Sequence, residues 1–293
     1  MAPTRLQIAK KDIIQYIDDL NRTILTRQDL GRILKEHRGF WRLAEATTVD
    51  GFISFLVEKS HLRELELLSQ HGYRRLVRYY WRDEPSPYEL SVSLRARSYL
   101  SHFSAVLLHD LTQQIPKTIY VNQEQSPKPR RDSTLEQHRI DTAFKSRPRT
   151  SKLVYTYGSV QIVLLSGKNT GNLGVIDMEA PDGRQVPVTN LERTLIDIVV
   201  RPHYAGGIEQ VRQAYTAARG RASLNKLVAI LRDMDLLYPY QQAIGFLAER
   251  AGFGSRPLVL LREFGLEFDF YLLHGMTETE YSKEWRLFYP KGF

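Results

Sequence analysis

Cysteine is missing from this chain of 293 residues. Its absence excludes disulfide bonds and metal sites built from thiolates. Long hydrophobic runs are missing too, because no stretch reaches the roughly 18 uncharged apolar residues of a membrane-spanning helix. The basic residues near the N-terminus are not followed by the apolar run of a secretory signal. We therefore expect a cytoplasmic protein that does not enter a membrane.

Acidic residues are fewer than basic ones, with 33 Asp and Glu against 41 Lys and Arg, and the net charge is +8. An excess of this sign favours an anionic partner. The hydrophobic fraction of 42% is ordinary for a globular protein. The length exceeds what one small module needs, so we predict two domains. The Pro85-Ser-Pro87 segment is the expected boundary, which gives domains over residues 1–85 and 86–293.

The N-terminal domain shows three helical patterns followed by two strand patterns. Apolar residues at helical spacing predict helices over 10–20, 26–37 and 48–60, with Thr26 and Thr48 as N-caps. Residues 62–68 alternate apolar and charged, and 74–81 form a second strand after a turn. Three helices and then a hairpin is the order of a winged helix-turn-helix, a DNA-binding module.

The DNA contacts of such a module come from the start of its third helix and from its hairpin, the wing. The residues expected to contact DNA here are Arg42, Thr47, Thr48, Arg74, Arg75, Arg78 and Arg82. Asp50 and Glu58 point outward from the third helix, and carboxylates repel phosphate. Residues 1–85 hold 15 basic and 12 acidic residues. A domain that binds only protein therefore remains an alternative.

A second basic cluster lies between residues 126 and 152. Its members are Lys128, Arg130, Arg131, Arg139, Lys145, Arg147, Arg149 and Lys152, against the acidic Asp132, Glu136 and Asp141. One interpretation is a solvated loop and helix face. The other is a second contact with nucleic acid or with an acidic face of a partner.

The C-terminal domain mixes helical and strand patterns. Helices are expected over 94–111, 134–144, 190–200, 207–218, 223–234 and 240–251, the third of these capped by Thr189 or Asn190. Strands are expected at 117–122, as a pair within 153–165, around the turns at 169–174 and 181–183, and in the tail from Pro257. The fold class is therefore α+β, with an N-terminal winged helix-turn-helix followed by a larger mixed α/β domain.

Signals for catalysis are weak. Ser166-Gly-Lys-Asn-Thr170 looks like a phosphate-binding loop, but Ile162 stands where that motif needs glycine, so we predict a hairpin turn. Asp177 and Glu179 lie two residues apart, as in metal nucleases, but no lysine follows at the required spacing, so we expect solvent-facing turn residues. The histidines show no metal-binding spacing, and His102 and His109 are expected in the core or on the surface. We expect no catalytic residue, metal or cofactor.

Several segments together resemble one family. They are residues 98–111, 114–122 and 187–197, which includes Glu192-Arg-Thr-Leu-Ile-Asp197, followed by Arg201-Pro202, Gly206-Gly207 and Glu209. These segments look like those of the AbiEi antitoxins of type IV toxin–antitoxin systems, and the resemblance covers most of the chain. From the residues alone, Asp197 is expected to form an ion pair with an arginine, and Glu209 lies where a carboxylate suits a helix start.

The resemblance implies a function. Proteins of that family repress their own operon by binding inverted repeats through an N-terminal winged helix, which would need two copies on the DNA. Their C-terminal domain counteracts a nucleotidyltransferase toxin without a stable complex, in systems that can act in phage defence. Two alternatives remain open: a stand-alone winged-helix transcription factor, and an enzyme acting on nucleic acid through carboxylates of the C-terminal domain.

Overall fold

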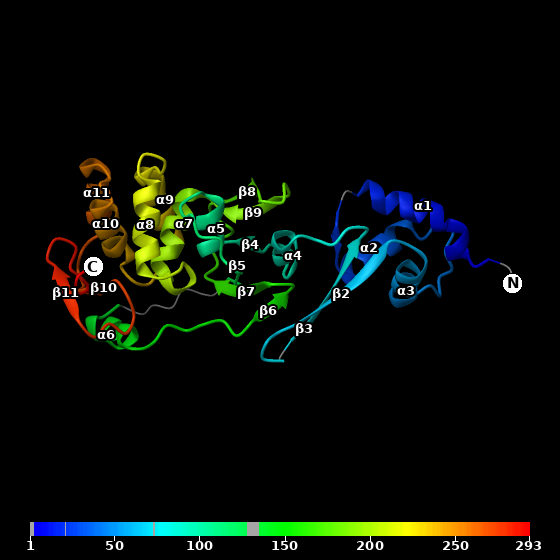
Figure 1. Ribbon diagram of the computed structural model, residues 1–293, viewed down its shortest axis with the longest axis horizontal. Helices are drawn as coiled ribbons and strands as arrows, with labels where there is room; N and C mark the ends of the chain where they lie inside the picture. The colour runs from blue at the N-terminus through cyan, green and yellow to red at the C-terminus, as the bar shows by residue number, and fades with distance from the viewer. Residues whose placement is uncertain (1–2, 21, 73, 128–134) are drawn as a thin grey trace.

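The computed structural model describes residues 3–20, 22–72, 74–127 and 135–293 (Figure 1). It is an α+β structure, as expected from the sequence. The molecule is elongated, with the N-terminal helices at one end and the helices of the C-terminal half at the other. Within the described residues, no helix is both long and apolar enough to cross a membrane.

The N-terminal part alternates helices and short strands. Its elements are α1 (Arg5–Asp19), β1 (Ile24–Leu25), α2 (Arg27–His37), α3 (Val49–Lys59), β2 (Leu62–Leu68) and β3 (Arg75–Trp81). The three strands form an antiparallel sheet in the order β1-β3-β2. Both predicted N-caps are present: Thr26 accepts from the Asp29 amide in a capping box, and Thr48 accepts from the Gly51 amide. The sequence analysis missed β1, which at two residues is too short to show a period.

A core of its own holds this part together. Ile13 of α1, Leu34 of α2 and Phe52 and Leu56 of α3 are all nearly or fully buried in one apolar cluster. Trp41, from the segment between α2 and α3, stacks on Phe52 with ring centroids 6.1 Å apart. The α2–α3 connection is therefore packed onto the core, and it fixes where α3 begins.

The larger part contains a mixed sheet, a helical layer and a small C-terminal sheet. Its first elements are α4 (Pro87–Ser93), β4 (Tyr99–Leu100), α5 (His102–Leu108), β5 (Thr118–Glu124), α6 (Gln137–Lys145), β6 (Val154–Tyr157), β7 (Val160–Gly167), β8 (Val175–Glu179) and β9 (Gln185–Thr189). They are followed by α7 (Leu191–Val200), η1 (Pro202–Tyr204), α8 (Ile208–Ala218), α9 (Leu224–Met234), α10 (Tyr240–Arg250), α11 (Ser255–Arg262), β10 (Phe270–Tyr271), β11 (Thr279–Ser282) and β12 (Leu287–Pro290).

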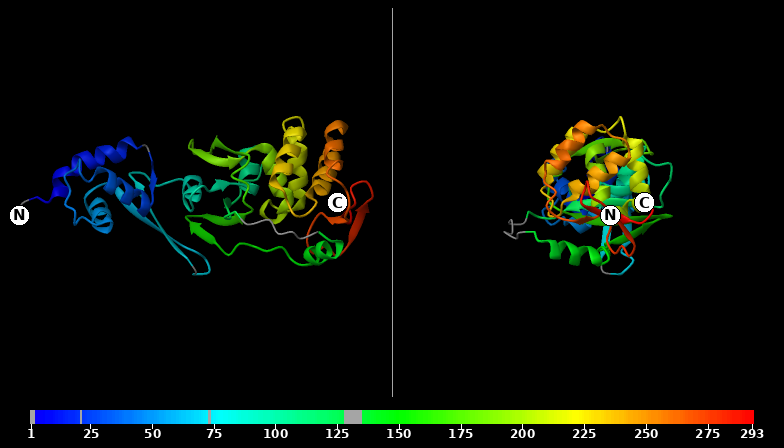
Figure 2. Two further views of the ribbon diagram at one scale, coloured as in Figure 1. Left: turned by 180° about the vertical axis from the view of Figure 1, so that it is seen from behind. Right: turned by 90° about the vertical axis from the view of Figure 1, so that its left-hand side faces the viewer.

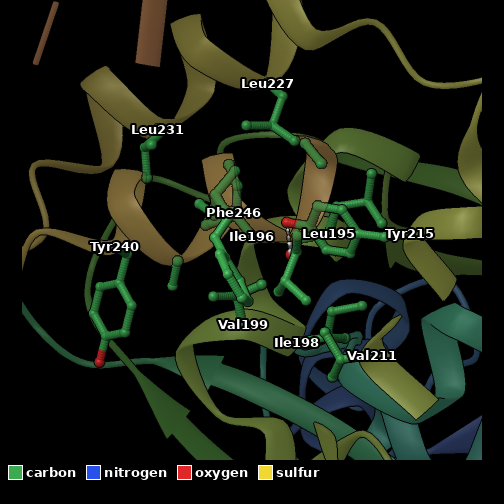
Figure 3. Packing of buried hydrophobic residues seen from close by; sticks show 14 of the residues in the cluster. Leu195, Ile196, Ile198, Val199, Val211, Tyr215, Leu227, Leu231, Tyr240 and Phe246 are labelled. Atoms are coloured by element: carbon green, nitrogen blue, oxygen red, sulfur yellow. Dashed lines mark hydrogen bonds between the residues drawn. The ribbon is translucent and has the colours of Figure 1, made fainter. Parts of the chain in front are cut away.

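The central sheet has the strand order β6-β7-β5-β4-β9-β8. The pairs β5–β7 and β4–β9 are parallel, and the other neighbours are antiparallel. Helix α7 lies in the centre of the helical layer, where Leu195, Ile196 and Ile198 pack against residues of α8, α9 and α10 (Figure 3). The indole ring of Trp285 packs directly against the backbone of α10 at Gly245. Any other residue there would clash, because its Cβ would lie 2.0 Å from the ring.

Three sequence predictions for this part are wrong. The helix expected over 94–111 is instead β4 and α5, because α4 already ends at Ser93 and positive φ angles at Arg97 and His102 break the run. The tail after Pro257 is not all strands, since α11 runs to Arg262. The segment after β7 is no hairpin turn, because β7 and β8 pair with different strands of the sheet.

The hairpin of β2 and β3 joins the two parts. Leu67 and Leu76, from one face of the hairpin, pack in the same cluster as Leu90 of α4 and apolar residues of the central sheet. At the tip, the Gln70 amide donates to the Val154 carbonyl of β6 (2.8 Å), next to a β-bridge between Ser69 and Tyr155. The predicted wing therefore rests on the edge of the central sheet.

Candidate nucleic-acid interface

The first turn of α3 is exposed and rigidly positioned. Thr48, at its N-cap, is exposed, and its hydroxyl accepts from the Gly51 amide at 3.1 Å. The Arg38 guanidinium donates to the carbonyl of Thr47 at 2.8 Å and also to the carbonyls of Ala44 and Glu45. These bonds hold the chain that leads into α3, so the two predicted threonines stand at a fixed, solvent-facing helix start. Such a start, with its free amides and positive dipole end, attracts anions.

The carboxylate of Asp50, in this same turn, is neutralised. Arg27, from the first turn of α2, binds it through two nitrogens, with Nε to Oδ1 at 3.0 Å and Nη2 to Oδ2 at 3.1 Å. Both side chains are exposed. The sequence analysis counted Asp50 as a repulsive group, but the pair with Arg27 removes most of that repulsion. Further along the outer side of the helix, Gly51 and Ser54 are small and exposed.

Two of the predicted hairpin arginines lie on the surface. Arg74 is exposed, and Arg75 is exposed while it pairs with Glu66 across the hairpin at 2.7 Å. Both lie close to the hairpin tip, where β6 begins to contact it. Solvent-exposed guanidinium groups at this position can reach phosphate.

Arg78 is a correction to the predicted contact set. Its side chain is only 9% exposed, and it donates to the carbonyls of Ser93 (2.9 Å) and Leu94 (2.8 Å) at the end of α4. It shares a strand face with Leu76, which packs into the core between the two parts. Burial lowers the pKa of this guanidinium, and the charge of Arg95 adds to the shift. Arg78 is therefore a link between hairpin and α4, and it cannot bind phosphate.

Arg82 and Arg42 both contact α1. Arg82 donates two hydrogen bonds to Asp18 of α1 (2.8 and 2.7 Å). Hydrogen bonds from Arg82 and from Trp81 lower the pKa of Asp18 to about 2. Arg42 is exposed and lines a groove with Arg5 and Phe40 beside α1. The predicted contact residues therefore occupy several places on the N-terminal part.

The sequence analysis missed Arg27 and Arg38. A signal for Arg27 was available, because it follows the N-cap Thr26 and so lies in the first turn of α2. Nothing in the sequence marks the pairing of Arg27 with Asp50, 23 positions away, because this contact depends on how α2 crosses α3. Arg38 is the C-cap of α2, a position where a long cation can reach free carbonyls.

The second basic cluster divides into parts. Lys128, Arg130 and Arg131 lie outside the described residues, and so does Asp132. Arg139 lies 3.8 Å from Glu136 on α6. The remaining cations, Lys145, Arg147, Arg149 and Lys152, are all exposed.

The candidate catalytic carboxylates lie on an edge strand of the central sheet. Asp177 and Glu179 belong to β8 and not to a turn, and both are exposed, as expected. Among the residues that the structure describes, no group of three histidines or carboxylates is placed to hold a metal ion. His102 and His109 are buried, which is the first of the two positions expected for them, the core or the surface, and burial lowers the pKa of each.

The segment Glu192–Asp197 is structural. Arg193 Nε donates to Asp197 Oδ1 at 2.9 Å, and both side chains are buried, so the predicted ion pair is confirmed. Glu192 pairs with Lys226 of α9 at 2.9 Å. Asn190 is the N-cap of α7, since its side chain accepts from the Arg193 amide. These contacts tie α7 to its neighbours and leave no reactive group of this segment facing solvent.

Comparisons with known proteins show the fold alone. Family models and curated proteins give no match to this chain. Among solved structures, the chain is similar to the crystal structure of the RV2827C protein from Mycobacterium tuberculosis, with a TM-score of 0.55 and 14% identity. The similarity covers 99% of this chain and 92% of that chain. Both parts of the present architecture therefore fall within a fold that another protein also adopts.

Proposed function

We propose that the N-terminal part is a winged helix-turn-helix that binds double-stranded DNA. Its elements follow the order helix, strand, helix, helix and hairpin, with β1 completing a three-stranded sheet. The observation that carries the proposal is the exposed side of the first two turns of α3, where Thr48 and Ser54 lie on either side of Asp50, whose carboxylate is paired with Arg27. A helix presented in this way suits the major groove, with Arg74 and Arg75 placed for the sugar–phosphate backbone.

In this proposal the chain is a transcriptional repressor and an antitoxin. It binds inverted repeats in its own promoter and counteracts a nucleotidyltransferase toxin in a type IV toxin–antitoxin operon that serves phage defence. The resemblance of residues 98–122 and 187–209 to the AbiEi antitoxins supports this finer assignment. The buried Arg193–Asp197 pair and the Glu192–Lys226 pair serve to hold the fold of the C-terminal part, which leaves antitoxicity to its exposed surface.

A gel-shift assay with the DNA upstream of the protein's own gene tests the repressor role. We expect a complex that survives an excess of unrelated duplex, because specific sites bind roughly 10³-fold or more tightly than others. A complex that the unrelated duplex removes completely would contradict the role of an operon repressor.

Co-expression tests the antitoxin role separately. If the adjacent gene encodes a nucleotidyltransferase that arrests growth, the full-length chain should restore growth. Restored growth would distinguish an antitoxin from a stand-alone transcription factor. Continued arrest at normal antitoxin levels would remove the antitoxin assignment and leave the DNA-binding one.

A further inference from the structure

An extended cationic segment connects α6 to β6. Residues 145–152 carry Lys145, Arg147, Arg149 and Lys152, all of them exposed, and no acidic residue. None of the four makes an ion pair within the part of the chain that the structure describes. Four exposed cations in eight residues make this segment a local concentration of positive charge, which favours an anionic partner.

The C-terminal end of this segment is bound to the sheet and to Tyr204. The Ser151 amide donates to the Tyr204 hydroxyl (2.7 Å), and the Ser151 hydroxyl donates to the Leu164 carbonyl of β7 (2.6 Å). The Leu153 amide then donates to the Ser151 hydroxyl at 3.2 Å. Lys152 and Arg149 therefore lie beside an anchored stretch of chain, where an anionic partner would bind them at little cost in backbone ordering.

The segment is continuous with the hairpin tip. The Ser69 amide donates to the Arg74 carbonyl (3.0 Å), and the Gln70 amide donates to the Val154 carbonyl (2.8 Å). Hydrogen bonds thus link the backbone next to Arg74 with the backbone two residues after Lys152. The acidic residue of β2 nearest the hairpin tip is Glu66. Its carboxylate is paired with Arg75.

The hairpin tip, α3 and this segment lie along the same long side of the molecule. Figure 1 and the left view of Figure 2 show all three in the lower half of the molecule. An extended chain rises about 3.3 Å per residue, so residues 147–152 cover roughly 16 Å. Each strand of duplex DNA places a phosphate about every 3.4 Å along its axis. A row of cations of this length is therefore comparable with the rise of about five base pairs of duplex.

We propose that residues 145–152 and the hairpin tip form one phosphate-binding strip, along which a DNA duplex held by α3 continues over the second part of the protein. This inference rests on the proposed function, because α3 brings the duplex to the strip. The strip adds affinity without sequence preference, and it lengthens the segment of DNA that the protein covers. A linear row of like charges suits a duplex better than it suits an acidic protein surface.

The test is the salt dependence of binding to a fluorescein-labelled duplex of roughly 30 base pairs, measured by anisotropy. One variant carries Lys145→Ala, Arg147→Ala, Arg149→Ala and Lys152→Ala. A matched control carries Arg184→Ala, Arg219→Ala, Arg256→Ala and Lys283→Ala, which removes the same charge from other exposed positions. A third variant, Ser54→Glu, places a carboxylate on the exposed side of α3.

We expect the strip variant to bind with a shallower slope of log affinity against log salt. The slope should change by about 0.9 for each phosphate that the variant no longer neutralises, and by up to roughly 3.6 for all four cations. The control should keep the slope of the unmodified protein, and thermal melting by circular dichroism should show that both variants are folded.

If the strip variant and its control have the same salt slope, the strip proposal is wrong. If Ser54→Glu loses binding in the same experiment, the proposed role of α3 in DNA binding still holds. If the strip variant binds DNA normally but no longer neutralises the toxin, the segment serves an acidic protein partner and the inference is wrong. Absence of duplex binding by the unmodified protein would remove both proposals.

Discussion

Individual side chains of the same type have different roles in this protein. Arg74 and Arg78 are four positions apart on one hairpin, yet one is exposed and the other binds two carbonyls at the end of α4. Substitution of Arg78 by Met leaves these carbonyl acceptors without a hydrogen-bond donor. A buried acceptor without a donor costs about 1–3 kcal/mol of stability. We therefore expect Arg78→Met to lower the free energy of unfolding by that amount in urea denaturation, with the salt slope of DNA binding unchanged.

Arg74→Met is the matched control for this prediction. Its side chain is exposed, so the stability should change by no more than about 0.5 kcal/mol, and the salt slope should become shallower by about 0.9. The opposite pattern, with Arg78 affecting binding and Arg74 affecting stability, would contradict the assignment of both residues.

The Asp18 carboxylate gives a prediction that depends on pH. Hydrogen bonds from Arg82 and Trp81 lower its pKa from 3.8 to about 2, so the folded state holds the ionised form more strongly than the unfolded state. The stability from this group is fully present above pH 3.8 and is lost as the pH falls through about 2. Asp18→Asn should therefore destabilise the protein at pH 7, and urea denaturation should show that the difference shrinks towards about pH 2. Asp12→Asn, at an exposed position on the same helix, should show no such convergence.

At the scale of the elements, the pairing of α2 with α3 controls the charge of the proposed DNA-binding turn. Removal of the carboxylate by Asp50→Asn frees the Arg27 guanidinium for phosphate, so we expect tighter duplex binding and a steeper salt slope, by about 0.9. Arg27→Ala leaves Asp50 uncompensated, so it should weaken binding. Anisotropy titrations of the two variants check this, and changes in the same direction for both would contradict the pairing argument.

The elements that the sequence predicted well have local signals. Both N-caps of α2 and α3 were found, because a threonine at the cap and the apolar spacing after it coincide. The region 94–111 was predicted wrongly, because its apolar residues fit a helix while the two-residue strand β4 is set by pairing with distant strands β5 and β9. The burial of Arg78 was missed for a related reason: β3 is the central strand of its sheet and is buried on both faces.

At the scale of the whole molecule, the hairpin belongs to both parts. One of its faces packs on the N-terminal helices through Leu62 and Trp81, and the other packs on the second part through Leu67 and Leu76. The sequence indicated a change of domain at Pro85 but could not show this contact, since it joins residues that are more than 80 positions apart, such as Ser69 and Tyr155. The relative placement of α3 and the cationic segment depends on this joint.

The most direct test of the central claim is the affinity of the unmodified protein and of Ser54→Glu for duplex DNA from upstream of its own gene. An added carboxylate on the exposed side of α3 should weaken binding by about tenfold or more, because like charges brought together at an interface cost several kcal/mol. The matched variant Ala217→Glu, on the exposed side of α8, should bind within about twofold of the unmodified protein. Equal affinities of Ser54→Glu and the unmodified protein would show that α3 does not face the DNA.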